Sequence, residues 1–488
     1  MTGEIEKTTN EKMFTAEEVS QHNTKESCWI IVHGKVYDVT DFLPEHPGGS
    51  KIILKYGGKD ATAEYDPIHP PDAISENLPP EKHLGRIDPM TVQDRIKETS
   101  QEEKESAARH AKKPPLGECL SLHDLEAVAK YVLTGKAWMY YSSGADDEIT
   151  MRENHNVYHR IWFRPRILRD VANVRFDTSI LGHKTSMPFY ITATALGKLG
   201  DPVNGELNLT RSAAKNGIIQ MIPTISSCSF DEMIDAALED QVQFLQLYVN
   251  SNREVTEKFV KRAESRGVKG LFVTVDAPQL GRREKDMRMK FEDVGIARTI
   301  STLIDPSLQW SDLDWLSSIT KMPIVLKGVQ SWQDAVIAAE RGCAGIVLSN
   351  HGGRQLDMAP SGLEILPEVV EALKARGLYN PSKFEIYIDG GVRRASDILK
   401  AVALGAKAVG IGRPFIYAYS AYGEDGVNRA MEILRDEFEM CMRLLGARSL
   451  EEVTPEMVNT ANLNALAVPK DNLFYSNYER LSGLNSKL

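Results

Sequence analysis

Long hydrophobic runs are absent from this 488-residue sequence, and cysteine is scarce. No apolar run approaches the roughly 18–20 residues that a membrane-spanning helix needs. The five cysteines are scattered and form no CxxC pair, which argues against a disulfide framework and a thiolate metal cluster. Basic residues are dispersed and outnumbered, giving a net charge of −10, so nucleic acid is not expected to be the main partner.

The two ends of the sequence bear on its cellular location. Residues 1–12 are polar and carry three glutamates, so they predict neither a secretory signal nor an Arg-rich transit peptide. Ser486-Lys487-Leu488 matches the peroxisomal import signal, which is read only at a free C-terminus. We therefore expect a peroxisomal location, with the mitochondrial intermembrane space or the cytosol as alternatives.

Two histidines stand in proline-rich loops near the start of the chain. His46 lies in the run 41–49, which breaks any regular element, and His69 follows 23 positions later, before Pro70. Proline restricts the backbone of such loops, and two axial ligands on opposite faces of a haem need fixed positions of this kind. Two imidazole ligands also leave no open position at the iron. Unrelated loop histidines are the plainer alternative. Zinc is another, although no Cys or carboxylate stands at ligand spacing.

The nonapeptide 41–49 and the spacing to His69 resemble the cytochrome b5 family. The resemblance implies a small α+β haem domain, to which we assign residues 12–88, with His46 and His69 binding the iron of haem b. Residues 29–32 and 35–39, on either side of His33-Gly34, predict a hairpin. Residues 89–115 are polar and end in two prolines, which predicts a solvated, partly helical linker that lets the haem domain swing.

The rest of the chain repeats a strand–helix pattern. Eight such units over about 250 residues predict a (β/α)8 barrel within residues 116–465. A doubly wound sheet is the alternative, but it would want a Gly-rich phosphate loop after the first strand, and none is present. The expected strands are 188–196, 218–224, 242–249, 270–276, 323–328, 344–350, 384–391 and 408–414.

Polar side chains gather where these strands end, as in barrel enzymes. The run 349–355 is the most informative, because two glycines let the backbone turn sharply between an imidazole, His351, and a guanidinium, Arg354. An imidazole can take a proton near neutral pH, and a guanidinium can bind a carboxylate through two hydrogen bonds. Taken alone, the run is equally compatible with a surface turn. Other polar strand ends are Gln246, Tyr248, Thr274, Asp276, Lys327, Asp389, Arg393 and Arg413.

Six segments together resemble the FMN-dependent 2-hydroxyacid oxidase/dehydrogenase family over about residues 122–463. They are 140–145, 246–248, 326–328, 349–355, 389–393 and 412–414. A b5-like module in front of such a barrel resembles the flavocytochrome b2 type, the L-lactate dehydrogenases that pass electrons to cytochrome c. The resemblance implies FMN and haem b as cofactors and a homotetramer in which the tail 466–488 reaches across neighbours.

The family resemblance also implies residue roles. His351 is the active-site base, Asp276 orients its imidazole, and Tyr248 hydrogen-bonds the substrate hydroxyl. Arg354 and Tyr140 bind the substrate carboxylate, with Arg283 as a second cation. Lys327 lies beside the flavin N1/O2 edge. The remaining FMN contacts are Ala193, Thr194, Ala195, Gln246, Thr274, Asp389, Gly390, Gly391, Val392, Arg393, Gly412 and Arg413.

The expected reaction is oxidation of a small L-2-hydroxy acid, most simply lactate to pyruvate, because Ala193–Ala195 and Ile225 suit a short side chain. A peroxisomal oxidase that reduces oxygen to peroxide is the first alternative, and a non-enzymatic haem relay is the second. The sequence departs from the family at Pro223, where a hydroxyl residue is common and the neighbouring Thr224 is a candidate substitute. The mobile loop expected within 284–322 is also short, near 291–302.

Overall fold

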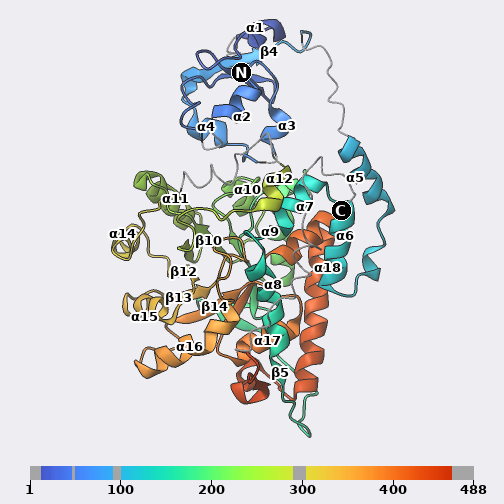
Figure 1. Ribbon diagram of the computed structural model, residues 1–488, viewed down its shortest axis with the longest axis vertical. Coiled ribbons are helices and arrows are strands. Elements are labelled where there is room, and N and C mark those ends of the chain that lie inside the picture. The colour runs from blue at the N-terminus through green and yellow to red at the C-terminus, as the bar shows by residue number, and fades with distance from the viewer. Residues whose placement is uncertain (1–11, 47–49, 67, 92–100, 290–303, 464–488) are drawn as a thin grey trace, which may run out of the picture.

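The N-terminal module is built on a mixed four-stranded sheet and stands above a larger barrel (Figure 1). The computed structural model describes residues 12–46, 50–66, 68–91, 101–289 and 304–463. The sheet order is β1-β4-β3-β2, with an antiparallel β2–β3 pair that turns at His33 and Gly34, both at positive φ. The predicted hairpin is thereby confirmed. The strands are β1 (Met13–Phe14), β2 (Trp29–Val32), β3 (Lys35–Asp38) and β4 (His83–Ile87).

Short helices pack on both faces of this sheet, because Val19 of α1 joins a cluster with Ile31, whereas Ile53 of α2 joins a separate cluster with Ile30. The two loop histidines lie among the helices of the second face. His46 precedes α2, and His69 lies between α3 and α4. The backbone N–H of each histidine donates to a carbonyl four residues earlier, on Phe42 and Tyr65, so each imidazole projects from a fixed turn. The helices are α1 (Ala16–Ser20), α2 (Ser50–Lys55), α3 (Thr62–Tyr65) and α4 (Ala73–Asn77).

Helix α5 (Gln101–Lys112) belongs to the barrel body, although the sequence places it in the linker 89–115. Ser106 and Arg109 donate hydrogen bonds to the carbonyls of Val132 and Leu133, at the end of α6 (Leu122–Val132). These carbonyls have no partner within α6, so the two side chains of α5 satisfy them. The range 89–115 is therefore not a solvated joint throughout.

Eight parallel strands close into a barrel, which confirms the predicted fold and rules out the doubly wound sheet. The runs are almost continuously buried, as expected for strands covered on both faces. Seven lie within the predicted ranges, and β12 extends one residue past its range, to Val329. In chain order the strands are β8 (Phe189–Ile191), β9 (Ile219–Ile222), β10 (Gln243–Leu247), β11 (Leu271–Thr274), β12 (Ile324–Val329), β13 (Gly345–Leu348), β14 (Glu385–Asp389) and β15 (Ala408–Ile411).

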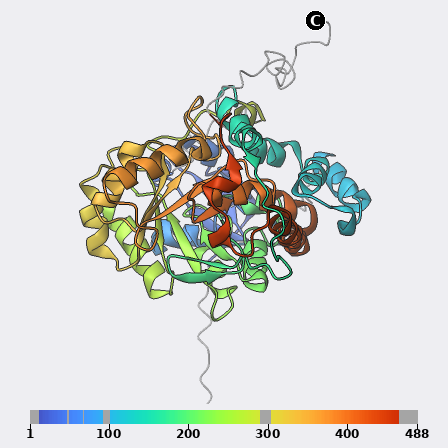
Figure 2. The same ribbon diagram turned by 90° about the horizontal axis from the view of Figure 1, so that it is seen from below.

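Helices surround the barrel, and Figure 2 shows the strands enclosed by them. They are α9 (Leu207–Asn216), α10 (Phe230–Asp235), α11 (Arg253–Ser265), α14 (Asp312–Ile319), α15 (Trp332–Glu340), α16 (Gly362–Ala375), α17 (Ala395–Ala403) and α18 (Arg413–Leu445). Helix α18 bends at Tyr422 and Gly423. Across the described residues, no helix has the length and apolarity needed to cross a membrane.

Large side chains fill the barrel interior and leave one end for chemistry. Tyr190, Phe244, Phe272 and Tyr387 are fully buried in one cluster inside the strands. The hairpin of β6 (Thr178–Ile180) and β7 (His183–Thr185) adds Ile180 to this cluster and closes the N-terminal end. The opposite end carries α7 (Gly135–Ser142), α8 (Ile149–Asn156) and α12 (Glu284–Met289). The expected short loop near 291–302 lies outside the described residues.

Candidate active site and haem site

One large cavity opens at the C-terminal ends of the barrel strands. The empty space that its lining bounds is about 1150 Å³, a figure that includes open solvent. Asp276 is the one predicted barrel-site residue outside its lining, and it lies behind His351. The cavity brings together Tyr140, Ala193, Thr194, Ala195, Gln246, Tyr248, Thr274, Arg283, Lys327, His351, Arg354, Asp389, Gly390, Gly391, Val392, Arg393, Gly412 and Arg413.

His351 is held between a carboxylate and a phenol. Its Nδ1 lies 3.1 Å from Oδ1 of Asp276, and its Nε2 lies 3.1 Å from the hydroxyl of Tyr248. The Asp276 side chain is almost fully buried. A carboxylate cannot donate, so Nδ1 carries the hydrogen and Nε2 is left as the acceptor that faces the cavity. His351 adopts a left-handed backbone conformation, φ 61°, which histidine tolerates better than most residues.

The surroundings of His351 keep its imidazole neutral. Burial lowers the pKa of His351 and outweighs the opposing effect of the Asp276 carboxylate, while Lys327 and Arg283 lower it further. A neutral imidazole is the form that accepts a proton. The site therefore holds a base that is ready at neutral pH.

Two guanidinium groups lie on the other side of His351, a buried one of Arg283 and a partly buried one of Arg354. The Arg354 guanidinium lies over the ring of Tyr140, with Cζ 5.1 Å from its centroid. Its Nη1 donates to the carbonyls of Tyr140 and Ser143, so the group is fixed in place. Burial lowers the pKa of Arg283 to about 10, and the charge of Arg354 adds to the effect. Two like charges on one wall of the cavity form a suitable binding site for a carboxylate.

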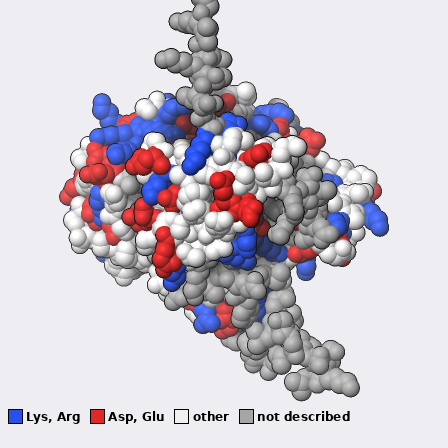
Figure 3. Space-filling view, turned by 90° about the horizontal axis from the view of Figure 1, so that it is seen from above, with Lys and Arg blue, Asp and Glu red and all other residues white. Residues whose placement is uncertain are grey.

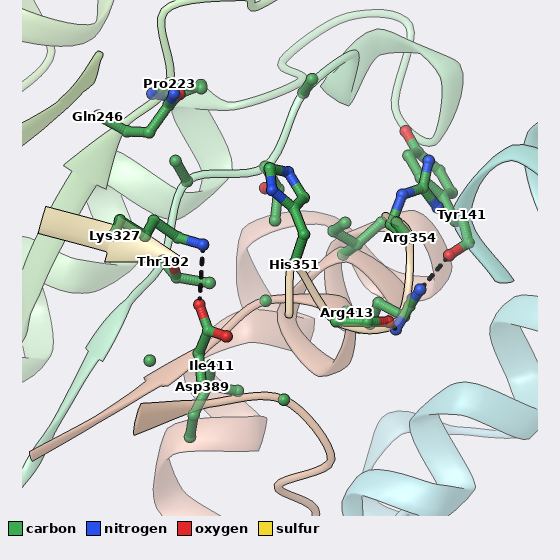
Figure 4. A pocket seen from close by; sticks show the side chains of 18 of the residues that line it. Tyr141, Thr192, Pro223, Gln246, Lys327, His351, Arg354, Asp389, Ile411 and Arg413 are labelled. Atoms are coloured by element: carbon green, nitrogen blue, oxygen red, sulfur yellow. Dashed lines mark hydrogen bonds and ion pairs between the residues drawn. The ribbon is translucent and has the colours of Figure 1, made fainter. Parts of the chain in front are cut away.

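Lys327 lies on the opposite wall and forms an ion pair. Its Nζ is 3.0 Å from Oδ2 of Asp389 (Figure 4). It also donates to Oγ of Ser349 at 3.2 Å. Burial alone would lower the pKa of Lys327, but the carboxylates of Asp389 and Asp276 outweigh it and raise the pKa. The ammonium group therefore stays charged, as the predicted place beside the flavin requires.

Gln246 and Thr274 form a polar pair where β10 and β11 end. The Gln246 side chain donates to Oγ1 of Thr274 at 3.0 Å. The Thr224 hydroxyl donates to the Gln246 carbonyl and accepts from the backbone N–H of Tyr248. Thr224 therefore fixes a strand end, whereas Pro223 lines the cavity. The idea that Thr224 replaces the missing hydroxyl at Pro223 is not supported, because its hydroxyl is already used by the backbone.

Several features of the cavity fit FMN. The hydroxyls of Thr192 and Thr194 are buried and have no hydrogen-bond partner among the described residues, although both residues line the cavity. A ligand rich in donors and acceptors would satisfy them. Gly390 and Gly391 have positive φ, and a Cβ at Gly391 would come within 1.8 Å of the Asn154 carbonyl oxygen. Only glycine fits at position 391. Without side chains, the backbone of Gly390 and Gly391 can approach a ligand closely.

The arginines expected at the phosphate lie where strands seven and eight end. Arg413 begins α18, and its guanidinium donates to the carbonyl of Tyr141 (Figure 4). It also donates to the carbonyls of Gly352 and Ser143. The Nε of Arg393 is 3.1 Å from Oε2 of Glu126. The positive charges of Arg393 and Arg413 thus lie where β14 and β15 end, near helix N-termini, which favour phosphate binding. The structure also gives Arg413 a role that sequence reasoning missed, which is to join α7 to the loop of His351.

Sequence reasoning also missed Thr192, Ser349 and Gln355. Gln355 donates to the carbonyls of Asp276 and Gln279 and accepts from the N–H of Gly281, so it ties the Asp276 loop to the His351 loop. Thr192 could have been found, because it is a polar residue at the end of a buried strand. Ser349 and Gln355 offered no signal beyond their place in the run 349–355.

In the N-terminal module, His46 and His69 face each other. Their ring centroids are 5.9 Å apart, close to the roughly 6 Å that two imidazoles need when each makes a bond of about 2 Å to one metal ion. Nδ1 of His69 lies 3.2 Å from the Tyr65 carbonyl oxygen, which leaves Nε2 for the metal. Burial lowers the pKa of His69 to about 4, so its imidazole is neutral. The described residues include no group of three or more His, Cys, Asp or Glu side chains that could hold a metal ion.

Two families match the chain, one for each domain. The FMN-dependent dehydrogenase family matches residues 129–460. The cytochrome b5-like heme/steroid binding domain matches residues 15–88. The two matches follow one another in the chain, the first covering the N-terminal module and the second covering the barrel.

Individual relatives extend these matches. An L-lactate dehydrogenase (cytochrome) of Wickerhamomyces anomalus is 54% identical, over 96% of this chain and 84% of its own. A peroxisomal (S)-2-hydroxyacid oxidase of Arabidopsis thaliana is 40% identical, over 71% of this chain and 98% of its own. A solved structure of mutant flavocytochrome b2 with pyruvate bound is 51% identical, with a TM-score of 0.72, and covers 77% of this chain and 97% of that one.

Proposed function

Because this chain belongs to the FMN-dependent dehydrogenase family and carries a cytochrome b5-like domain in front of the barrel, we propose that it oxidises L-lactate to pyruvate and passes the electrons through haem b to cytochrome c. The cytochrome-type relative matches nearly the whole chain, including both domains. When bound, FMN supplies the two-electron acceptor and haem the one-electron carrier.

The observation that carries the proposal is the neutral His351 imidazole, which lies in the same cavity as two guanidinium groups. Nε2 of His351 takes a proton from the hydroxy acid, and the Asp276 carboxylate stabilises the imidazolium that forms. The hydroxyl of Tyr248 lies at the same nitrogen and is placed to hydrogen-bond the substrate hydroxyl. Tyr248 thus orients the substrate toward the base.

The substrate carboxylate binds to Arg354 and Arg283. The guanidinium of Arg354 is already fixed by the carbonyls of Tyr140 and Ser143, so little freedom is lost when it binds an anion. A carboxylate held there is anchored on one side of His351, which positions the carbon that loses hydrogen. Lys327, with its raised pKa, keeps a positive charge on the wall opposite Arg354. This is the side on which the flavin would gain negative charge when it is reduced.

Mixing the holoenzyme with L-lactate without oxygen tests the proposal. We expect the flavin absorbance to bleach first, the haem spectrum to become that of the ferrous form next, and added cytochrome c to be reduced. A non-enzymatic haem relay would show no flavin bleaching with any 2-hydroxy acid. An oxidase would instead form hydrogen peroxide in air as fast as it consumes the acid, with the haem left oxidised. The oxidase relative matches only 71% of this chain, which favours the haem route.

The pH dependence of kcat/KM follows from the pKa of His351. Because the base must be neutral and burial lowers its pKa, we expect kcat/KM to rise with pH and to level off above an apparent pKa below about 6.5. Asp276 raises the pKa of His351, so Asp276→Asn should move this limb to lower pH while lowering kcat. Initial rates with ferricyanide from about pH 5 to 8 measure both. If the rise of kcat/KM moved to higher pH in Asp276→Asn, the assignment of His351 and Asp276 as base and orienting carboxylate would be contradicted.

The location and the oligomer stay proposals. Both Ser486-Lys487-Leu488 and the tail 466–488 lie outside the described residues. We propose that, at a free C-terminus, the tripeptide directs peroxisomal import, which microscopy of a fusion with and without it can test. We also propose a homotetramer, for which light scattering gives the mass.

A further inference from the structure

The N-terminal module contacts the barrel through α4 and the loop before it. Ile68, next to the haem ligand His69, packs against the hydrophobic cluster of the barrel. Beyond this apolar contact, Arg262 on α11 lies 2.8 Å from Oε1 of Glu76 and 3.9 Å from Oδ2 of Asp72, both in the module. In Figure 1 this part of the module faces α10 and α11. The contact therefore fixes the side of the module that holds His69.

The barrel holds Arg262 in place for this contact. Its Nη2 forms an ion pair with Asp231, at the start of α10. Its guanidinium also lies over the Phe230 ring, with Cζ 5.9 Å from the centroid. Because Asp231 and Phe230 both belong to the barrel, the barrel holds the guanidinium in position. Its remaining N–H groups can then donate to the module.

Arg262 is also the cation that separates three carboxylates. Burial raises the pKa of Asp72, and the nearby charges of Glu76 and Asp231 raise it further, while Arg262 lowers it. Without Arg262, two carboxylates of the module would face one of the barrel, and like charges repel. Seen from above, the outer surface of the molecule carries acidic and basic side chains mixed together (Figure 3).

We propose that Arg262 docks the haem module onto the barrel, through Glu76 and Asp72, in the position that receives electrons from the flavin site. The proposal rests on the proposed transfer from FMN to haem. Arg262 is a positioning residue here, since it touches neither substrate nor the expected cofactor sites. Its contribution is moderate, because Glu76 is half exposed and water and salt weaken such pairs.

Arg266, the residue that caps the C-terminal end of α11, offers a matched control. It pairs with Asp231 at 3.2 Å and also with Asp235, both in the barrel. Among the described residues, no ion pair joins it to the module. Arg266→Gln thus removes a similar charge at the end of the same helix but leaves the docking contact intact.

Stopped-flow mixing with L-lactate separates docking from chemistry. In Arg262→Gln we expect flavin bleaching at the parent rate and haem reduction slower by about two- to fivefold, the range of an exposed ion pair. Arg266→Gln should match the parent in both. High salt should slow haem reduction in the parent toward the rate of Arg262→Gln. Glu76→Gln should have a similar effect, and the double variant should fall short of the product of the two. Equal haem reduction in Arg262→Gln and the parent would overturn the proposal.

Cross-linking of the holoenzyme gives a readout that does not depend on turnover. Zero-length carbodiimide treatment of Arg262→Lys should join α11 to Glu76 or Asp72, and peptide mass spectrometry identifies the bond. Arg266→Lys should join α11 only to Asp231 or Asp235. Absence of any bond from position 262 to the module would refute docking. If lactate failed to bleach the flavin, the proposed function would fail, and this cross-link would still decide the contact.

Discussion

His351→Gln is expected to lower lactate turnover by a factor of about 10² to 10⁴ while FMN stays bound. A glutamine side chain can hydrogen-bond to Asp276 and Tyr248, but it cannot accept the proton in the transition state. The interaction is lost mainly in the transition state, so kcat and kcat/KM should fall together. Steady-state rates with ferricyanide and the flavin spectrum of the purified variant measure the two halves of this prediction.

Two further variants guard the His351 experiment against misfolding. His351 has a left-handed backbone, which asparagine adopts more readily than glutamine, so His351→Asn tests whether backbone strain matters. His159→Gln changes an exposed histidine outside the cavity and should leave turnover unchanged. Near-parent rates in both His351 variants, with FMN bound, would exclude this imidazole as the base.

His69→Ala is expected to abolish reduction of cytochrome c while lactate still bleaches the flavin. Removing one of two axial imidazoles opens the sixth position of the iron, so the low-spin haem spectrum and most of the haem should be lost. The barrel should remain folded, because its hydrophobic cluster is built from its own residues, with Ile68 as a partly buried neighbour from the module. Haem content, the visible spectrum and anaerobic flavin bleaching measure the three parts.

His46→Ala should reproduce these effects, since the two rings face each other across the same gap. His33→Ala is the control within the module. That histidine is more than half exposed and pairs with Asp66 at 2.8 Å, so its variant should keep the parent haem spectrum. A six-coordinate low-spin spectrum in His69→Ala would show that another residue binds the iron.

The sequence by itself determined the order of elements, because that depends on local patterns. Continuous apolar runs predicted the barrel strands, and their polar ends predicted which loops meet at one mouth, since parallel strands bring their C-terminal ends together. The run 349–355 placed an imidazole and a guanidinium on one turn. The loops around His46 and His69 likewise predicted two facing ligands, because proline fixes the backbone at each.

Only the tertiary structure decided which partners these groups meet. Arg413 and Arg354 both donate to the Ser143 carbonyl, and Lys327 pairs with Asp389, across separations in sequence that no local pattern records. The polar composition of α5 predicted solvent contact, yet two of its side chains satisfy the last carbonyls of α6. Arg262 read as one more charge on a helix surface. Its partners Glu76 and Asp72 belong to a second domain, nearly two hundred residues earlier in the sequence. Only the packed structure brings these carboxylates within reach of Arg262.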